Sequence, residues 1–153
     1  MPRLVIAVEP APADVAAVIQ AGLRAYNDAY VEWAPTLRFA VFVHDEAGEP
    51  VGGLEAVLRW GWLRVDNFWL PAPLRGQGLG SAVLCEAERF ARDRGCTRSY
   101  LDTFEFQALR FYERHGYRVF GVQEGFPPGH RRYYLEKSLD AVPDAVPDAV
   151  PDA

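Results

Sequence analysis

The chain has 153 residues, half of them hydrophobic and 13% aromatic, which is enough apolar material for a packed globular core. Its formal net charge of −5 offers no basic surface to nucleic acid, and no apolar run approaches the ~20 residues that a membrane span requires. Neither nucleic acid nor a membrane is therefore expected as a partner.

Two cysteines, Cys85 and Cys96, bear on the compartment of the protein. They lie eleven positions apart across a predicted helix, a rise of about 16 Å, which is too far for a disulfide. Reduced thiols, together with a start that is too short and too soon acidic for a secretory leader, predict a cytoplasmic protein. No metal site is expected.

In the first half of the chain, the sequence predicts a strand, then a helix, then a hairpin of two strands. Residues Leu4 to Val8 are typical of a short strand, and apolar residues then recur at helical spacing from Val15 to Tyr26. The β-branched and aromatic run from Leu37 to His44 predicts a strand that continues, after a turn, into a hairpin partner. In that partner, the pair Gly52-Gly53 predicts a bulge or a close backbone approach.

A segment without a clean period separates the first helix from the next strand. It holds aromatic and acidic groups at Tyr26, Tyr30, Glu32 and Trp33. These residues could face a small-molecule cleft, or the aromatic rings could simply pack.

The second half alternates strands and helices. We expect these elements at Trp62–Leu70, at a long helix from Ser81 to the stop at Arg94-Gly95-Cys96, and then at Ser99–Thr103, Gln107–His115, Tyr117–Val122 and Arg132–Leu135. The imperfect alternation of Trp62 to Leu70 indicates a strand covered on both faces. At the end of the short helix, His115 is expected on the surface, stabilised by the helix dipole.

The stretch from Trp69 to Ser81 organises the rest of the chain. A strand-like run ends there, a proline-rich turn follows, and Gly76, Gly78 and Gly80 precede the long helix. Each glycine weakens a helix start by up to ~1 kcal/mol relative to alanine, so together they indicate backbone amides brought close to a ligand. The free N–H groups and the positive end of the helix dipole favour an anion such as phosphate, and Arg75 adds a charge beside it.

Several interpretations compete for these glycines. A Walker-type loop needs Gly-Lys-Ser/Thr at its end and is set aside because no lysine is present. A dinucleotide fingerprint fits Gly76 and Gly78, but Ser81 occupies its third position. The spacing Arg-x-x-Gly-x-Gly is met by Arg75, Gly78 and Gly80. A helix start without any ligand is the structural alternative.

The C-terminal residues 140–153 are dominated by an Ala-Val-Pro-Asp repeat. Regular prolines forbid a helix, and the four-residue unit carries too little apolar surface to order itself. We therefore expect a single domain over residues 1–139 and a solvated, extended tail at 140–153.

The glycine motif and three further stretches together resemble the GCN5-related N-acetyltransferase (GNAT) superfamily. Arg75, Gly78 and Gly80 match its coenzyme A loop. The segment Gln107–Tyr117 resembles its Ala-x-x-x-Tyr-x-x-x-Gly-Phe/Tyr motif. The runs Val65–Leu70 and Cys96–Thr103 resemble the strand that leads into the coenzyme loop and the parallel strand that follows it.

The four matches occur in the family's order and cover roughly residues 37–139. One position departs from the family, since many members carry asparagine where this chain has Glu105, and Gln107 could substitute for the missing amide. The resemblance implies an α/β (mixed α+β) fold, with a central twisted mixed sheet of six to seven strands flanked by helices. It also implies a splay between two central parallel strands, where acetyl-CoA lies.

The resemblance further implies how coenzyme A is held. Its pantetheine would pair with backbone groups of Phe68 and Leu70, the N–H of Leu70 would reach the carbonyl oxygen, and Pro71 would end the pairing because it has no N–H. The expected coenzyme-binding residues are Phe68, Trp69, Leu70, Arg75, Gly76, Gln77, Gly78, Leu79, Gly80, Ser81, Gln107 and Phe111.

Acetyl transfer to an amine needs a neutral amine, a polarised carbonyl and a protonated leaving thiolate. By its position in the family's motif, Tyr112 is the expected general acid, and a tyrosine hydroxyl is protonated at pH 7; the alternative is a packing residue on an amphipathic helix. Asp66 stands where many relatives carry an acidic group, so the resemblance implies that it is the base, directly or through water; the alternative is a solvated carboxylate at a strand end. Further candidates for the base or for substrate binding are Glu32, Asp102, Glu105 and His130.

The sequence thus predicts an acetyl-CoA-dependent N-acetyltransferase that acts on a primary amine of a small molecule. Direct attack without a covalent intermediate is expected, because neither cysteine lies near the expected carbonyl site. Protein or peptide amines are alternative acceptors. A non-catalytic acyl-CoA sensor and a nucleotide-dependent oxidoreductase are rival functions, and the oligomeric state, including a homodimer, is left open.

Overall fold

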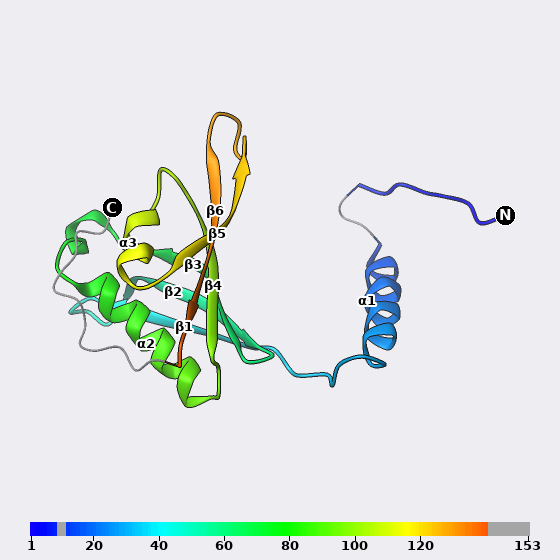
Figure 1. The fold of residues 1–153 in the computed structure, drawn as a ribbon, viewed down its shortest axis with the longest axis horizontal. Coiled ribbons are helices and arrows are strands. Elements are labelled where there is room, and N and C mark those ends of the chain that lie inside the picture. The colour runs from blue at the N-terminus through cyan, green and yellow to red at the C-terminus, as the bar shows by residue number, and fades with distance from the viewer. Residues whose placement is uncertain (9–11, 141–153) are drawn as a thin grey trace. The chain divides into compact units, whose positions relative to one another are not determined.

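The computed structural model describes residues 1–8 and 12–140, so the predicted tail lies outside the described residues from position 141 onward. The chain divides into two compact units, Met1–Ala34 and Pro35–Ala153. The second unit holds a six-stranded sheet in the order β1-β2-β3-β4-β6-β5 (Figure 1). Its elements are β1 (Leu37–His44), β2 (Pro50–Arg59), β3 (Trp62–Trp69), the short 3-10 turn η1 (Ala72–Leu74), α2 (Leu79–Asp93), β4 (Arg98–Phe104), α3 (Leu109–Arg114), β5 (Arg118–Glu124) and β6 (Arg131–Ser138).

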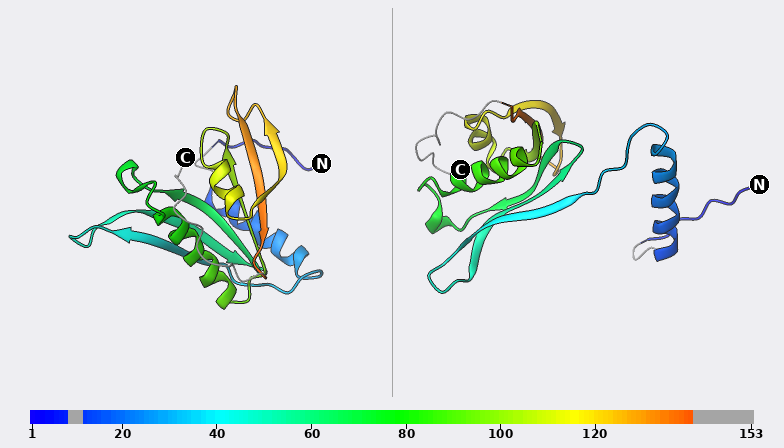
Figure 2. Two further views of the ribbon diagram at one scale, coloured as in Figure 1. Left: turned by 60° about the vertical axis from the view of Figure 1, so that its left-hand side comes forward. Right: turned by 90° about the horizontal axis from the view of Figure 1, so that it is seen from below.

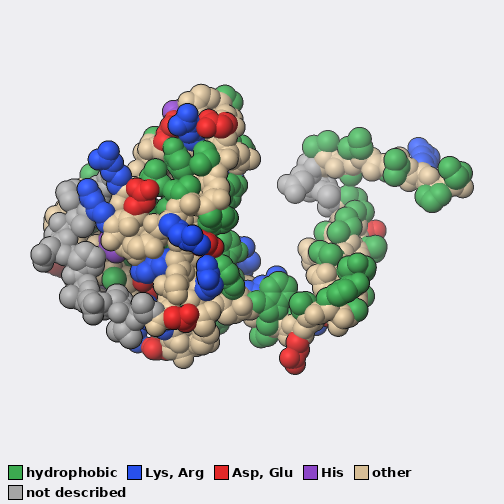
Figure 3. Space-filling model, in the orientation of Figure 1, with side chains coloured by type: hydrophobic (Ala, Val, Ile, Leu, Met, Phe, Trp, Pro, Cys, Tyr) green, Lys and Arg blue, Asp and Glu red, His purple; other side chains and the backbone are tan. Residues whose placement is uncertain are grey.

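The first unit contains α1 (Ala13–Asn27), as its helical spacing predicts. The strand predicted at Leu4–Val8 is wrong: these residues have no secondary structure and are exposed. An apolar, β-branched run becomes a strand only where a neighbouring backbone pairs with it, and propensity alone does not supply that partner. The apolar side chains of α1, such as Ile19 and Leu23, are also exposed within this unit (Figure 3). In the described ranges, no helix is both long enough and apolar enough to cross a bilayer.

The two glycines of β2 show both features that their sequence predicts. Between β1 and β2 the register shifts next to Val43, as a bulge requires. At Gly53, which has φ +153°, an added Cβ would lie only 2.3 Å from the carbonyl oxygen of Val41. The hairpin backbones therefore approach more closely than any other residue type would allow.

A second bulge lies in β3, where Asp66 has no partner across the β2–β3 ladder. Ala56 pairs with Val65 and Glu55 pairs with Asn67, so one residue of β3 is extra. An extra residue resets the inward and outward alternation of a strand. The sequence analysis attributed the imperfect alternation of Trp62–Leu70 to a strand covered on both faces. The structure corrects this interpretation, because the bulge at Asp66 explains the break in the alternation.

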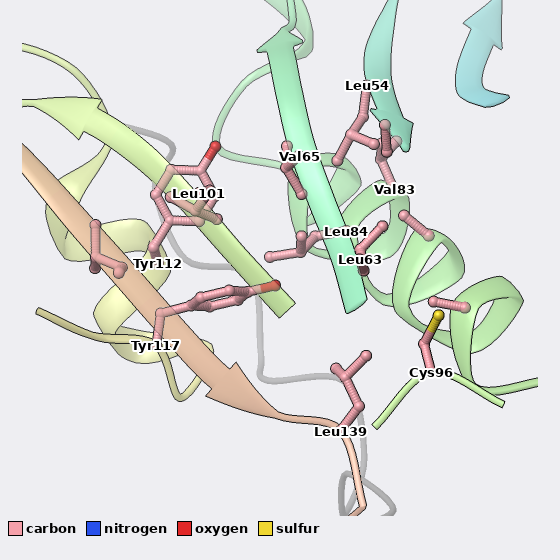
Figure 4. Close-up of a cluster of buried hydrophobic side chains, with 14 of the residues drawn as sticks. Leu54, Leu63, Val65, Val83, Leu84, Cys96, Leu101, Tyr112, Tyr117 and Leu139 are labelled. Atoms are coloured by element: carbon pink, nitrogen blue, oxygen red, sulfur yellow. The ribbon is translucent and has the colours of Figure 1, made fainter. Parts of the chain in front are cut away.

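Helix α2 covers one face of the sheet (Figure 2), and Val83, Leu84, Ala87 and Ala91 bury its apolar stripe. The core cluster that they join, part of which is drawn in Figure 4, also includes Leu54, Leu63, Val65, Leu101, Phe111, Tyr112 and Leu135. Full burial of one such leucine contributes about 1.5–3 kcal/mol relative to exposure, so this layer is the main source of stability for the fold.

A buried polar cluster accompanies the core. The carboxylate of Glu88, on α2, is 1% exposed and accepts hydrogen bonds from Nζ of Lys137 at 2.9 and 3.0 Å and from the hydroxyl of Tyr117 at 3.0 Å. The Ser99 hydroxyl lies 2.8 Å from the same tyrosine oxygen. A buried carboxylate is tolerated only when it is paired in this way, so the cluster fixes α2 against β4 and β6.

The pKa of Tyr117 lies well above its ordinary value, first because burial opposes the phenolate and second because the Glu88 carboxylate repels it. The native state therefore holds this proton more tightly than the unfolded chain does. Its contribution to stability is complete below the unfolded pKa of about 10 and is lost as the pH rises above that value. We expect the free energy of unfolding, measured with urea from pH 8 to 11, to fall above about pH 10.

The variant Tyr117→Phe checks the source of this fall. At pH 8 it should be less stable than the wild type by about 1–3 kcal/mol, because a buried carboxylate loses a donor. The difference from the wild type should narrow above about pH 10, and a constant difference would contradict the assignment. Tyr30→Phe, at an exposed position, is the matched control and should follow the wild type at every pH.

Candidate active site

The site begins where two central strands separate. Parallel strands β3 and β4 pair at Trp62 with Arg98, Leu63 with Ser99 and Arg64 with Tyr100, and the ladder stops there. Both strands continue, and a cavity of about 500 Å³ opens between their diverging ends. The predicted splay between two parallel strands is therefore confirmed.

The cavity brings together many of the residues that the sequence singles out. Of the expected site residues, those that line it are Asp66, Phe68, Trp69, Leu70, Arg75, Asp102, Gln107, Phe111 and Tyr112. Residues that line it and were not predicted are Val65, Asn67, Leu101, Thr103, Phe106 and Ala108. Neither Cys85 nor Cys96 is among the lining residues.

Asp66 reaches the cavity from the β3 bulge and is already paired with an arginine. Its carboxylate accepts from Nε of Arg64 at 2.5 Å and from a second guanidinium nitrogen of Arg64 at 3.3 Å. This hydrogen bond is the main cause of a raised pKa for Arg64. Each oxygen of the carboxylate therefore already accepts a hydrogen bond from one guanidinium group.

Tyr112, the expected acid, comes from the six-residue helix α3 on the other side of the cavity. Its side chain is buried, with 6% of its surface exposed, and its ring contacts the rings of Phe111 at 5.3 Å and Tyr117 at 5.8 Å. Figure 4 shows its ring within the apolar cluster. The residue thus packs in the core and also lines the cavity, so the two roles weighed from sequence are compatible.

The glycine segment forms a tight loop into α2. Gly78 has φ +78° and precedes the first helical residue. The first intrahelical bond runs from the N–H of Ala82 to the carbonyl of Gly78 at 3.0 Å, so the N–H groups before it, those of Leu79, Gly80 and Ser81, have no acceptor within the helix. These amides and the helix dipole make the turn suited to an anion.

Two side chains of this loop brace its backbone. Nε of Arg75 donates to the Leu70 carbonyl at 2.8 Å, and Nε2 of Gln77 donates to the Pro73 carbonyl at 2.8 Å. Both bonds hold the turn between β3 and α2 in one conformation. Their effect is to preorganise the amides of the first helical turn.

His115 and Ser81 differ from what their sequence positions suggest. The surface location predicted for His115 is wrong, since it is 6% exposed and its Nε2 lies 2.9 Å from Oγ of Ser81. The reason is that α3 ends inside the protein, against α2. There the His115 ring forms a hydrogen bond with a residue of α2 and not with water. The Ser81 side chain, which is fully buried, is committed to this bond.

Gln107 sits at the end of β4. Its Oε1 accepts from the Thr103 hydroxyl and from the Phe104 N–H, each at 3.3 Å. The side chain therefore caps the strand end beside the cavity. Whether its amide also serves the coenzyme stays a prediction.

Charged and aromatic groups gather where β4 ends and β6 begins. Nδ1 of His130 lies 2.8 Å from the Glu105 carboxylate, and its ring meets Phe106, which is 57% exposed, edge to face at 4.9 Å. Asp102 accepts from Nε of Arg132 at 2.7 Å. The sequence analysis did not identify Phe106 as a site residue. The signal that could have pointed to it is an aromatic residue that follows a strand and stands next to Glu105.

The other predicted substrate residues belong to the first unit. There the rings of Tyr26 and Tyr30 lie 5.4 Å apart, and the Arg24 guanidinium lies 4.4 Å from the ring centre of Trp33. Their role in substrate binding, with that of Glu32, stays a prediction.

Comparison with known proteins shows to which family the chain belongs. The sequence profile of the acetyltransferase (GNAT) family matches residues 13–117. The chain belongs to the GNAT acetyltransferase family. It is therefore an acyltransferase, and the expected family and fold are confirmed.

Two relatives of this GNAT acetyltransferase are similar over most of its length. Blasticidin-S acetyltransferase of Streptomyces morookaense is 41% identical over 110 residues, covering 71% of this chain and 81% of that protein. The crystal structure of an acetyltransferase from Bacillus cereus is 32% identical, with a TM-score of 0.79, over 87% of this chain and 97% of that one.

A more distant structure shares the fold alone. An aminoglycoside 6′-N-acetyltransferase complexed with coenzyme A is 20% identical, with a TM-score of 0.59 over 70% of this chain and 76% of that one.

Gly52 offers a test of how the cavity wall of this GNAT acetyltransferase is built. A Cβ added there would lie 2.8 Å from the Trp69 carbonyl oxygen and 3.2 Å from side-chain atoms of both Leu70 and Pro71. We expect Gly52→Ala to lower the free energy of unfolding by about 1–3 kcal/mol in urea denaturation, because the end of β3 must move.

Gly121→Ala on β5 is the matched control, since a Cβ there meets nothing closer than 3.7 Å. It should change the free energy of unfolding by less than about 1 kcal/mol. Equal decreases in the free energy of unfolding for the two variants would show that Gly52 is not in close contact with the end of β3.

Proposed function

We propose that this acetyltransferase moves an acetyl group from acetyl-CoA to the primary amine of a small molecule. The observation that carries the proposal is the cavity between the diverging ends of β3 and β4, lined by both Asp66 and Tyr112. Such a gap gives an amine acceptor and an acyl donor a place to meet beside groups able to move protons.

The residues present fit coenzyme A. Beyond Arg64, β3 has no β4 partner in the described ladder, which leaves backbone groups near Phe68 and Leu70 for an extended pantetheine chain. The amides of the first turn of α2, with Arg75 nearby, suit its diphosphate. When bound, acetyl-CoA would supply the thioester carbonyl that the amine attacks and the thiolate that leaves.

The protein's own groups divide the proton transfers. Tyr112 is proposed to donate its hydroxyl proton to the leaving thiolate, for which it needs no unusual pKa. Asp66 is proposed to receive the amine proton, directly or through water. Because Arg64 already holds that carboxylate, we expect Asp66 to contribute less than Tyr112. Cys85 and Cys96 do not line the cavity, which supports direct transfer without an acyl-enzyme.

A small acceptor agrees with the dimensions of the cavity and with the relatives. About 500 Å³ lies within the range of small-molecule sites. The name of the Streptomyces relative makes blasticidin S the first acceptor to test. Asp102 and Phe106 line the cavity, and the His130 ring contacts Phe106. We propose that the acceptor approaches over these three residues.

Tyr112→Phe tests the acid. We expect acetyl-CoA and an active amine to release free thiol with the wild type, and the variant to lower kcat by about 10²–10⁴-fold, because the thiolate loses its proton donor. The Kd for coenzyme A, measured by calorimetry, should stay unchanged.

Two other results of the same assays would overturn this assignment. Thiol release by the wild type that stays flat across a broad panel of amines, blasticidin S included, would favour an acyl-CoA sensor. An undiminished kcat in the variant would assign the acid role elsewhere.

Gly78→Glu tests the anion-binding turn. We expect the carboxylate to repel a diphosphate at the N-terminus of α2 and to raise the Kd for coenzyme A at least tenfold. Gly95→Glu, at the other end of the same helix, is the matched control: it adds the same charge at a glycine of similar φ, +83°, in open space. It should leave the Kd unchanged.

An unchanged Kd in Gly78→Glu would contradict the proposed turn.

A further inference from the structure

A buried pair of hydrogen bonds joins the first turn of α2 to the end of α3. Oγ of Ser81 lies 2.9 Å from Nε2 of His115, and Nδ1 of the same ring lies 2.7 Å from the carbonyl oxygen of Phe111. Ser81 has no exposed surface and His115 is 6% exposed. Water therefore competes for neither bond.

The Phe111 carbonyl fixes one proton position. A carbonyl oxygen only accepts, so Nδ1 carries a proton and donates to it, and in the singly protonated ring Nε2 is left as an acceptor. The Ser81 hydroxyl then donates to Nε2, and every polar atom of the pair is satisfied. This direction turns the hydroxyl into the protein, so the first turn of α2 presents backbone N–H groups to a ligand without help from the Ser81 side chain.

We propose that His115 is a positioning residue that holds α3, and with it Tyr112, in a fixed place relative to the first turn of α2. The inference rests on the proposed function, in which this turn binds the diphosphate of coenzyme A and Tyr112 supplies the proton. His115 then couples binding of the coenzyme A diphosphate by the first turn of α2 to the position of the Tyr112 hydroxyl.

The shortness of α3 makes its position depend on the contacts that it forms with its neighbours. A helix of six residues is too short to be stable on its own, so contacts with its neighbours set its position. The His115 ring packs on Phe111 at 4.3 Å between centres, and Phe111 packs on Phe68 of β3 at 5.8 Å. One imidazole therefore touches the wall of the cavity through Phe111 and the anion-binding turn through Ser81.

The effect on catalysis follows from the geometry of proton transfer. A donor must lie within hydrogen-bond reach of its target, and a misplacement of about 1 Å can cost up to about 10²-fold in rate. Loss of the Ser81–His115 bond frees α3 to shift by such an amount. The core contacts of Tyr112 remain, so the fold survives.

The test compares Ser81→Ala, His115→Asn and the double variant. Asparagine can donate its amide N–H to the Phe111 carbonyl from the place of Nδ1, but its shorter side chain then puts no acceptor within reach of the Ser81 hydroxyl. We expect each single variant to lower kcat by about tenfold or more and to raise the Kd for coenzyme A. The double variant should be no worse than the worse single one, because both changes break the same bond. His115→Gln, whose amide oxygen can accept from Ser81, should recover part of kcat.

Ser99→Ala is the matched control. This serine is also fully buried and its hydroxyl lies 2.8 Å from the Tyr117 oxygen, but it lies on β4 and outside the link. It should lower the midpoint of thermal unfolding while kcat and the Kd for coenzyme A stay within about twofold of wild type.

Three results would overturn the proposal, and they are distinguishable. If Ser81→Ala and His115→Asn behave like Ser99→Ala, the pair is structural only. If Ser81→Ala weakens coenzyme binding and His115→Asn does not, the serine hydroxyl binds the diphosphate itself. A wild type that neither binds coenzyme A nor releases thiol overturns the proposed function, and this inference with it.

Discussion

The end of the β3–β4 ladder after Arg64 and Tyr100 is the constraint on which the site depends. Backbone N–H and C=O groups need partners, so two strands can separate inside a sheet only if each is held on its other side. Here β3 stays paired with β2 as far as Trp69, and β4 stays paired with β6 as far as Phe104. The gap is thus stable, and its walls are main chain that an extended ligand can bind.

Helix α2 lies across both parts of this divided sheet and is anchored differently at its two ends. Around Glu88, a buried cluster includes Ser99, which belongs to the paired part of β4. At the other end, Ser81 bonds His115 beside the open part. Charge and hydrogen bonding therefore hold α2 to β4 and β6 beside the paired part of the sheet, and a single hydrogen bond joins α2 to His115 beside the open part. A carboxylate anchor at this end of α2 would compete with a diphosphate for the same backbone N–H groups.

Much of this could be predicted from sequence, because local signals determined it. Helical periodicity, the glycine loop and the Tyr112 segment are short-range patterns, and each lies where it was expected. The failures are non-local. Leu4–Val8 has strand propensity without a partner, the bulge at Asp66 depends on how β2 pairs with β3, and the burial of His115 depends on where α3 docks. No window of sequence contains those contacts.

The glycine loop before α2 and the side chains beside the cavity differ in the same way, because the loop offers mainly backbone groups to a ligand and the cavity offers side chains. In the loop, the Arg75 Nε and the Gln77 amide support backbone carbonyls, so the diphosphate would be read by amides that any side chain could accompany. Such a grip can be shared by a whole family. Where β4 ends beside the cavity, Asp102 accepts a hydrogen bond from Arg132, and Glu105 is paired with His130. If the amine acceptor binds there, as proposed, its selection would depend on how those ion pairs and the exposed Phe106 ring fit one amine.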